Sequence, residues 1–272
     1  MSLTRTECDE IRELEETEGA PEQNDPAGPC RVYSVGFQCP HVVELFHYDE
    51  GPLPAGQFRL QTLFAGISAG TELTHFTGTN PYMNARWDDD LKLFMPDGHS
   101  EYPMPFTGYM EVGRVVASRF DGVEEGQVIA LNYGHKSGHT CDPARETYVP
   151  LPERMEPLLG IYVSQMGPIC ANAILHADEE ELGAAVSSLG AGLRDRHVMV
   201  MGTGVIGLLT GMMAKDAGAC EVVIVGRNPH RLVIAERLGL TPLNNQETEP
   251  GEWAKRHWKT DWLERGADVV FQ

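Results

Sequence analysis

The sequence predicts an α/β protein in two parts, a small β-rich domain followed by a partial, doubly wound parallel sheet. Within residues 31–152, short β-branched and aromatic runs are separated by Gly and Pro, a pattern typical of antiparallel strands. From about residue 158, apolar residues recur at helical spacing. After residue 195 the order becomes strand, glycine turn, helix and strand. We therefore expect one domain over residues 29–160 and a second over residues 161–272.

The first domain is expected to be a small antiparallel barrel or sandwich. Gly and Pro in residues 51–56, and Asp and Gly in residues 121–126, predict two hairpin-type turns. Long loops carry Trp87, Tyr102 and Phe106, which are weaker candidates for lining a ligand site. The predicted strands cover residues 42–48, 58–64, 113–117, 127–131 and 146–150.

The second domain is expected to alternate strands and helices, which is the pattern of a parallel sheet. One helix should cover residues 158–174, and another should follow directly after the glycine turn. The predicted strands cover residues 197–201, 221–226, 240–244 and 267–271, and the later helices cover residues 232–239 and 251–263.

Charge narrows the range of partners. The 272 residues hold 21 Lys and Arg against 40 Asp and Glu, a net charge of -19, which repels nucleic-acid phosphates and anionic lipid. Nine acidic and two basic residues fall within residues 1–28, so this segment is expected to be an acidic, disordered tail. We expect a small-molecule substrate and no nucleic-acid or membrane partner.

The cysteines indicate the compartment. Six are scattered along the chain without a Cys-x-x-Cys pair, and nothing before them has the pattern of a secretory leader. We therefore expect reduced thiols and a cytoplasmic protein.

A glycine motif points to a dinucleotide. Gly202-x-Gly204-x-x-Gly207 follows an apolar strand and opens an apolar helix, the context that this fingerprint requires. The first glycine allows a tight turn, the second a close approach of the backbone to a pyrophosphate, and the third the packing of helix on strand. The cofactor-binding residues predicted here are Gly202, Thr203, Gly204, Val205, Ile206 and Gly207.

The next strand indicates which dinucleotide. It ends at Gly226, nineteen residues after Gly207, where an NAD enzyme places an acid for the ribose 2′-hydroxyl. Here Gly226 leaves room, Arg227 can pair with a 2′-phosphate, and Arg231 lies one helical turn further on. This favours NADP(H). The alternative is a solvated Arg227 and a site that does not distinguish the two cofactors.

Several segments together resemble one family. The resemblance rests on a β-rich domain ahead of the glycine fingerprint and on the sequences of residues 64–73, 108–116, 126–130 and 166–172. In these features the chain resembles the medium-chain dehydrogenase/reductase superfamily, that is, the alcohol dehydrogenases and their zinc-free relatives. The resemblance implies a GroES-like β-barrel followed by a Rossmann domain. It also implies two further sheet strands beyond residue 272, the last of which commonly pairs two subunits. We therefore expect a C-terminally truncated chain that associates or aggregates when expressed alone, and a homodimer for the full-length protein.

The same resemblance predicts whether the protein binds zinc. The catalytic zinc ligands of the family fall here on Ala69, Tyr109 and Cys170, so two of three are lost, and a lone Cys cannot hold the ion. The four-cysteine lobe for structural zinc is also missing. His135-x-x-x-His139-x-Cys141 is an alternative metal site, although its glycines favour a loop beside the cleft. We expect no metal, with Cys170 a small buried side chain.

The catalytic candidates are two hydroxyls. Thr71 occupies the place of the family residue that hydrogen-bonds the substrate oxygen, and Tyr109 is a second donor. The alternative for Tyr109 is packing of a ring where a metal ligand once stood. Glu72 replaces an aspartate and is expected to be structural. The implied function is a zinc-independent, NADP(H)-dependent oxidoreductase acting on a small carbonyl, alcohol or enone; the alternative is a catalytically inactive NADP-binding or scaffold protein.

Overall fold

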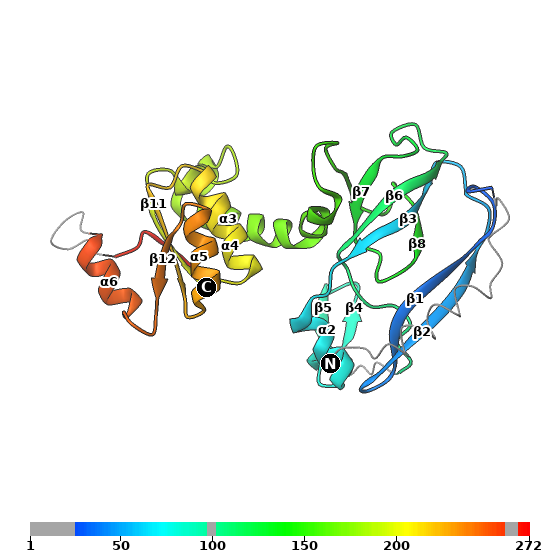
Figure 1. The fold of residues 1–272 in the computed structure, drawn as a ribbon, viewed down its shortest axis with the longest axis horizontal. Helices are drawn as coiled ribbons and strands as arrows, with labels where there is room; N and C mark the ends of the chain where they lie inside the picture. Colours follow the sequence, from blue (N-terminus) through cyan, green and yellow to red (C-terminus); the bar gives the residue numbers. More distant parts are fainter. Residues whose placement is uncertain (1–24, 97–101, 259–265) are drawn as a thin grey trace.

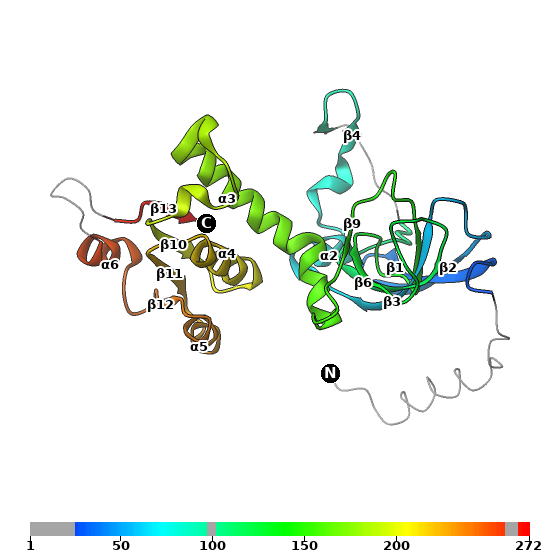
Figure 2. The same ribbon diagram turned by 90° about the horizontal axis from the view of Figure 1, so that it is seen from above.

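The computed structural model describes residues 25–96, 102–258 and 266–272, arranged as two lobes joined by a long helix (Figures 1 and 2). Strands β1 to β9 form the first lobe, and β10 to β13 with their helices form the second. Most of the predicted acidic tail (residues 1–24) and the end of the helix predicted over 251–263 lie outside the described residues.

The first lobe contains a five-stranded antiparallel sheet in the order β8-β3-β6-β7-β9. Phe58, Leu60, Ile129 and Leu131 are buried on one side of it. Four of its strands confirm predicted ones, and residues 121–126 do join the paired strands β6 and β7. The strands are β3 (Phe58–Ala65), β6 (Glu111–Ser118), β7 (Val128–Leu131), β8 (Gly138–Cys141) and β9 (Tyr148–Pro150).

The other predicted hairpin is wrong. Residues 51–56 connect β2 (Val42–Glu50) to β3, but β2 pairs with the unpredicted β1 (Cys30–Cys39), whereas β3 pairs with β6 and β8. The physical reason lies in Leu53, which is buried and whose N–H donates to the Ala27 carbonyl at 2.8 Å. The segment therefore crosses between two sheets. Strand β1 forms single bridges to Lys136 and Met104, which lie outside the strands of the five-stranded sheet, and a closed barrel stays a prediction.

A buried arginine anchors the end of the predicted tail. Arg59 is 4% exposed and donates to the carbonyl oxygens of Pro26 (3.1 Å), Gly28 and Gly51 (2.7 Å). Carbonyl oxygens pack around a buried guanidinium because its N–H groups need partners. The prediction of disorder is therefore wrong for residues 25–28.

The loops of the first lobe contain short elements that local patterning did not reveal. The long loop after β3 holds a helix, α2 (Ala69–Thr77). It begins within residues 64–73, one of the segments that carry the resemblance to the dehydrogenases. A 3₁₀ turn (Pro81–Asn84) and a small ribbon follow, formed by β4 (Arg86–Asp88) and β5 (Leu93–Met95).

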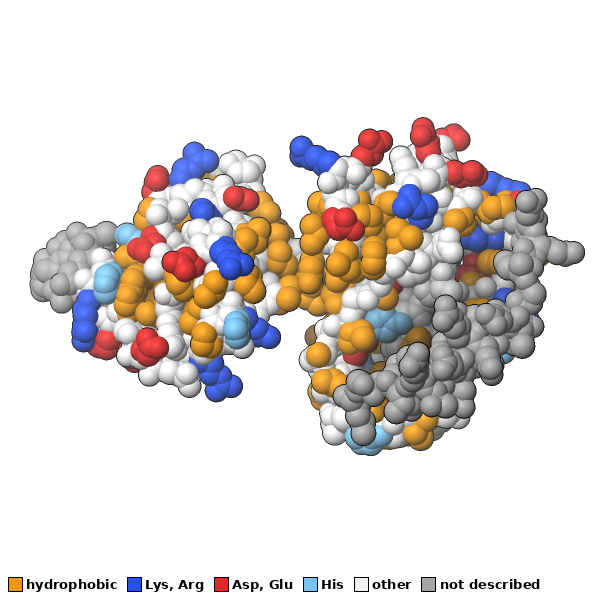
Figure 3. Space-filling view, in the orientation of Figure 1, with side chains coloured by type: hydrophobic (Ala, Val, Ile, Leu, Met, Phe, Trp, Pro, Cys, Tyr) orange, Lys and Arg blue, Asp and Glu red, His pale blue; other side chains and the backbone are white. Residues whose placement is uncertain are grey.

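The connection between the lobes is helical. Short turns at Pro157–Leu159 (3₁₀) and Tyr162–Met166 (π) lead into α3 (Gly167–Leu182), whose Cys170, Ile174 and Ala177 are buried. Further 3₁₀ turns follow at Gly183–Ala185 and Ala191–Leu193. Apolar side chains gather around the narrow connection in the view of Figure 3. One helical stretch of the described chain, Pro157–Ala185, is long and apolar enough to cross a membrane by length and composition alone.

The second lobe is a four-stranded parallel sheet in the order β12-β11-β10-β13. This is the strand order of a doubly wound fold, as predicted. Its strands are β10 (His197–Met201), β11 (Glu221–Gly226), β12 (Thr241–Asn244) and β13 (Val269–Phe271), and its helices are α4 (Val205–Asp216), α5 (Pro229–Arg237) and α6 (Pro250–His257).

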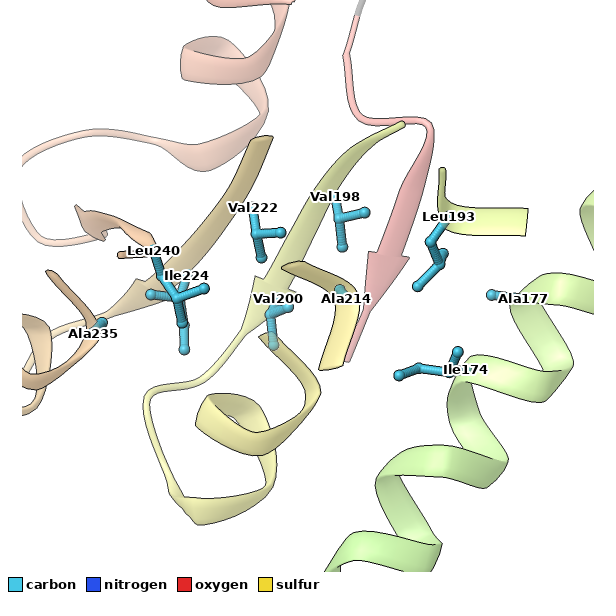
Figure 4. Close-up of a cluster of buried hydrophobic side chains, with 10 residues drawn as sticks. All are labelled: Ile174, Ala177, Leu193, Val198, Val200, Ala214, Val222, Ile224, Ala235 and Leu240. Atoms are coloured by element: carbon cyan, nitrogen blue, oxygen red, sulfur yellow. The ribbon is translucent and has the colours of Figure 1, made fainter. Parts of the chain in front are cut away.

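Both faces of this sheet are covered. On one face Val198, Val200, Val222 and Ile224 pack against side chains of α3, α4 and α5 (Figure 4). On the other, Met199, Val223 and Val225 pack against α6 and Trp258. Burial on both faces explains why the strands are continuous apolar runs rather than alternating ones. Because β10 is held in the sheet in this way, the loop after it lies at the carboxyl edge of the sheet.

Candidate active site

The turn between β10 and α4 has the shape that its glycines predict. Gly202 has a φ of +115°, a conformation that favours glycine, and its N–H donates to the Val225 carbonyl at 2.8 Å. A Cβ on Gly207 would collide with the carbonyl oxygen of Gly202. One glycine therefore permits the turn and the other permits α4 to pack against it. We call residues 202–207 the glycine turn.

Gly204 differs from the other two glycines. Its φ of -81° suits any residue, and a Cβ placed on it would meet no atom within 4 Å. It caps the start of α4, where backbone N–H groups lack helical partners and the helix dipole is positive. Nothing within the described protein requires a glycine at this position. Open space at a helix N-terminus is the condition for close approach of an anionic ligand.

Two cavities flank the glycine turn. The larger, about 540 Å³, lies toward β11 and is lined by Gly226, Arg227, Asn228, Arg231 and Asn245 besides the turn itself. The smaller, about 290 Å³, lies toward α3 and β13, with Thr210 and Phe271 in its wall. The exposed side chains of Val205 and Ile206 follow the turn. The arrangement offers space for two halves of one extended ligand on either side of a helix N-terminus.

The end of β11 corrects one detail of the sequence interpretation. A Cβ on Gly226 would lie 2.5 Å from the Thr203 side chain, so the room at Gly226 is filled by buried Thr203 rather than left open. Arg227 and Arg231 are exposed on the rim of the larger cavity. Neither guanidinium has a hydrogen-bond or ion-pair partner among residues 25–96, 102–258 and 266–272, so both can receive an anion.

The structure brings the two predicted catalytic hydroxyls together. Thr71 lies in the first turn of α2, Tyr109 precedes β6, and the Tyr109 hydroxyl donates to Thr71 Oγ1 at 3.3 Å. Thr71 is exposed and Tyr109 is half-buried. We call these two residues the hydroxyl pair. The Tyr109 hydroxyl therefore has a partner near the surface, and its role as a donor to substrate stays a prediction.

Ionisable side chains adjoin the segments that carry this pair. Glu72 accepts from the Ser68 N–H at 2.6 Å and from His135 Nε2 at 2.7 Å. His135 Nδ1 faces Glu111 Oε1 at 3.6 Å, and Glu111 is fully buried. Burial raises the pKa of the Glu111 carboxyl, against backbone hydrogen bonds such as that from Tyr133. The structural role expected for Glu72 therefore includes a histidine partner that the sequence did not reveal.

The residues present do not fit the family's catalytic zinc. Ala69 has no donor atom, and Cys170 is fully buried in α3, its Sγ 3.5 Å from the Ile206 carbonyl. Burial raises the pKa of the Cys170 thiol, which disfavours the thiolate that zinc requires. Within the described part of the chain, no group of three or more His, Cys, Asp and Glu side chains is placed to hold a metal.

The residues of the alternative metal motif contact other side chains. His139 pairs with Glu146 at 2.6 Å and stacks on Tyr133 at 4.8 Å, and Cys141 is buried in the sheet core. His139 and Cys141 belong to β8, so the loop expected here is wrong for residues 138–141. The reason is non-local, because β8 gains its ladder from β3, nearly eighty residues earlier.

The aromatic candidates fill local positions. Trp87 packs edge-on against Phe94 with ring centroids 5.0 Å apart, and Phe106 against Tyr48 at 5.6 Å. The Tyr102 hydroxyl donates to the carbonyl of His75 and so holds the end of α2. None of the three borders the cavities at the glycine turn.

Two further polar residues lie beside Tyr109 without any signal in the sequence. The Asn132 amide is 2.8 Å from the Gln165 amide, and its best orientation donates to the Tyr109 carbonyl at 3.0 Å. Asn132 follows β7, and Gln165 belongs to the π turn that leads into α3. Such π turns occur frequently at functional sites.

Known proteins share this architecture. D-guloside 3-dehydrogenase of Escherichia coli is 25% identical over 236 residues, which are 86% of this chain and 64% of that protein. The chain thus spans less than two thirds of that relative's length. Among solved structures, L-idonate 5-dehydrogenase of Escherichia coli has a TM-score of 0.63 at 18% identity, covering 90% of this chain and 70% of that one.

A third similar protein is a putative zinc-binding dehydrogenase of Sinorhizobium meliloti solved with NADP. Its TM-score is 0.60 at 16% identity, with 89% of this chain and 69% of that one covered. No family model matches the chain. The fold is that of these dehydrogenases of known structure, and most of the sequence is similar to D-guloside 3-dehydrogenase.

Proposed function

We propose that the protein is an NADP(H)-dependent, zinc-independent oxidoreductase that acts on a small organic carbonyl, alcohol or enone in the cytoplasm. The observation that carries the proposal is Gly204, a glycine at a helix N-terminus with open space in front of it. Gly202 and Gly207 are explained by the protein's own geometry, but Gly204 is explained by a ligand that approaches the backbone. The dehydrogenases that the chain resembles support the same chemistry.

The preference for NADP(H) rests on charge. Arg227 and Arg231 lie on the larger cavity, and no acidic side chain lines it. A carboxylate there would accept from the ribose 2′-hydroxyl of NAD and would repel a 2′-phosphate, whereas a guanidinium pairs with that phosphate. The NADP bound to the Sinorhizobium meliloti protein is compatible with this assignment.

The chain's own residues then have separate tasks. Bound NADP(H) would supply or accept the hydride through its nicotinamide. The glycine turn and the first turn of α4 would hold the pyrophosphate through backbone N–H groups. In the free protein the single Tyr109 proton is donated to Thr71 Oγ1. With substrate bound, this proton turns to the substrate oxygen, so that Thr71 and Tyr109 both donate where negative charge develops as a carbonyl is reduced. The hydroxyl pair would thus stabilise the negative charge on the substrate oxygen, as the metal ion does in zinc enzymes.

Replacing Gly204 tests the proposal. Gly204→Val fills space that no protein atom occupies, so the variant should fold as the wild type does but bind NADPH at least about a hundredfold more weakly, having lost several charge-assisted contacts. Gly51→Val is the matched control, since its Cβ also meets no atom within 4 Å. NADPH fluorescence titration and thermal unfolding measure the two effects. Equal NADPH affinity in both variants would remove the basis of the proposal.

Turnover separates the enzyme from the inactive alternative. Wild-type protein with NADPH should reduce at least one member of a panel of aldehydes, ketones and enones. Tight NADPH binding without turnover on the whole panel would favour the binding or scaffold function.

Metal analysis tests zinc independence. Because Ala69 and Tyr109 stand at ligand positions, dialysed protein should retain well under one zinc per chain. One zinc per chain kept through a mild wash would contradict the assignment and redirect attention to His135, His139 and Cys141.

A further inference from the structure

His135 contacts the two segments that carry the hydroxyl pair. Its backbone N–H donates to the Thr107 carbonyl at 2.7 Å, two residues before Tyr109. Its ring lies directly against Gly108, where a Cβ would come within 2.7 Å of three ring atoms. Gly108 has a φ of +86°, so the backbone turns sharply over the imidazole just before Tyr109. The position of the ring therefore fixes the path of the chain into Tyr109.

The same ring holds the other hydroxyl segment. Nε2 donates to Glu72 at 2.7 Å, and Glu72 follows Thr71 directly. The second oxygen of Glu72 accepts from the Ser68 N–H at 2.6 Å, which ties the start of α2. One imidazole thus connects the turn before Tyr109 with the helical turn that contains Thr71.

The environment keeps this ring in place. Its side chain is 11% exposed, and the side chains of Glu72 and Glu111 beside it are 9% and 0% exposed. Glu111 Oε1 has no hydrogen-bond partner among the described residues and faces Nδ1 at 3.6 Å. Two buried carboxylates on opposite sides of one imidazole favour a single orientation of the ring. By contrast, the 3.3 Å contact between the hydroxyls lies near the surface.

We propose that His135 is a positioning residue, which aligns Thr71 and Tyr109 by holding Glu72 on one side and the turn at Gly108 on the other. The inference rests on the proposed function, since it assigns His135 to the donor pair of that reaction. His135 does not touch the substrate in this scheme. It acts through the hydroxyl pair, whose misplacement by about 1 Å is expected to slow the reaction about a hundredfold.

The test compares two histidines of one segment. His135→Gln removes the ring between the two hydroxyl segments, and His139→Gln is the matched control because His139 also pairs with one carboxylate and is 14% exposed. We expect kcat to fall about tenfold to a hundredfold in His135→Gln and less than about twofold in His139→Gln. NADPH affinity should be unchanged in both, because the glycine turn belongs to the other lobe. Equal losses of kcat would overturn the proposal.

A double-mutant cycle asks through which residue His135 acts. If it acts through the hydroxyl pair, His135→Gln should lower kcat by a smaller factor in the Thr71→Val background than it does in the wild type. Multiplied losses in the double variant would show that His135 acts by another route, and would also overturn the proposal.

A second readout needs no substrate. In protein with ¹³C-labelled tyrosine, the resonance of Tyr109 is identified by its loss in Tyr109→Phe. The Tyr109 resonance should shift in His135→Gln and stay in place in His139→Gln, where the resonance that moves should instead be that of Tyr133, which stacks on His139. An unmoved resonance in folded His135→Gln would refute the positioning role. Should the wild type turn over no member of the carbonyl panel, the proposed function fails, yet this measurement still decides the role of His135.

Glu72→Gln covers the case in which His135→Gln does not fold. An amide at this position keeps one acceptor but cannot accept from both Ser68 and His135. The Tyr109 resonance should move in this variant as well, and a folded Glu72→Gln protein with an unmoved resonance would count against the proposal.

Discussion

The glycine turn and the hydroxyl pair are constructed in opposite ways. Every residue assigned to the cofactor lies within residues 202–231, which run from the glycine turn through α4 and β11 into the first turn of α5. The hydroxyl pair and its support come from residues 71, 109 and 135, on three segments of the other lobe. In the first region sequence neighbours are also spatial neighbours, so each residue has a separable task. In the second, distant segments must meet, so the effects of substitutions should be coupled.

The largest expected effect distinguishes two glycines of one turn. A side chain at Gly207 overlaps the Gly202 carbonyl, so Gly207→Val should destabilise the second lobe by about 3 kcal/mol or more and abolish NADPH binding. Gly204→Val should lose binding alone. Thermal unfolding and NADPH titration of both variants check this. If both unfolded alike, the tasks within the turn would not be separable.

The next effect concerns the hydroxyl pair. Tyr109→Phe and Thr71→Val each remove one donor to the substrate oxygen, which should lower kcat about a hundredfold to a thousandfold. Their combination should lose less than the product of the single effects, because the two hydroxyls already contact each other. Steady-state kinetics with the best substrate of the panel measures this. Retained kcat in Tyr109→Phe would return Tyr109 to a packing role.

A smaller effect is expected at the edge of the cofactor cavity. Arg227→Ala should weaken NADPH binding about tenfold to a hundredfold, because one charge-assisted contact contributes about 1.5 to 3 kcal/mol. The affinity for NADH should be nearly unchanged. Parallel titrations with both cofactors decide it. Equal losses would mean that Arg227 does not distinguish them.

The smallest effect is one of stability and pH. Burial raises the pKa of Glu111 in the folded protein, so the stability that this carboxyl contributes is present below its unfolded pKa and is lost as pH rises through the folded value. Glu111→Gln should therefore gain in melting temperature relative to the wild type as the pH is raised from about 4, near the ordinary pKa of Glu, to about 8. If the difference in melting temperature between the variant and the wild type did not change with pH, ionisation of Glu111 would not destabilise the folded protein.

The sequence determined the second lobe well. Strands 197–201 and 221–226, the turn between them and the helix after it follow from residues within some thirty positions of one another. The glycine spacing is a local constraint, since Gly202 needs its φ and Gly207 needs its missing Cβ regardless of the first lobe. Even here a pair contact went unforeseen, because the side chain that fills the space at Gly226 belongs to Thr203.

The first lobe shows what tertiary structure alone decides. Strands β1 and β8 and the path of residues 51–56 depend on pairing and burial between distant segments, as does the anchoring of residues 25–28 by Arg59. The resemblance marked Thr71 and Tyr109, but only the folded chain placed their hydroxyls 3.3 Å apart and set His135 between their segments. Sequence patterns report contacts that repeat along the chain. A buried imidazole between two carboxylates is a single long-range contact, fixed by which strands pair, and so it leaves no periodic trace.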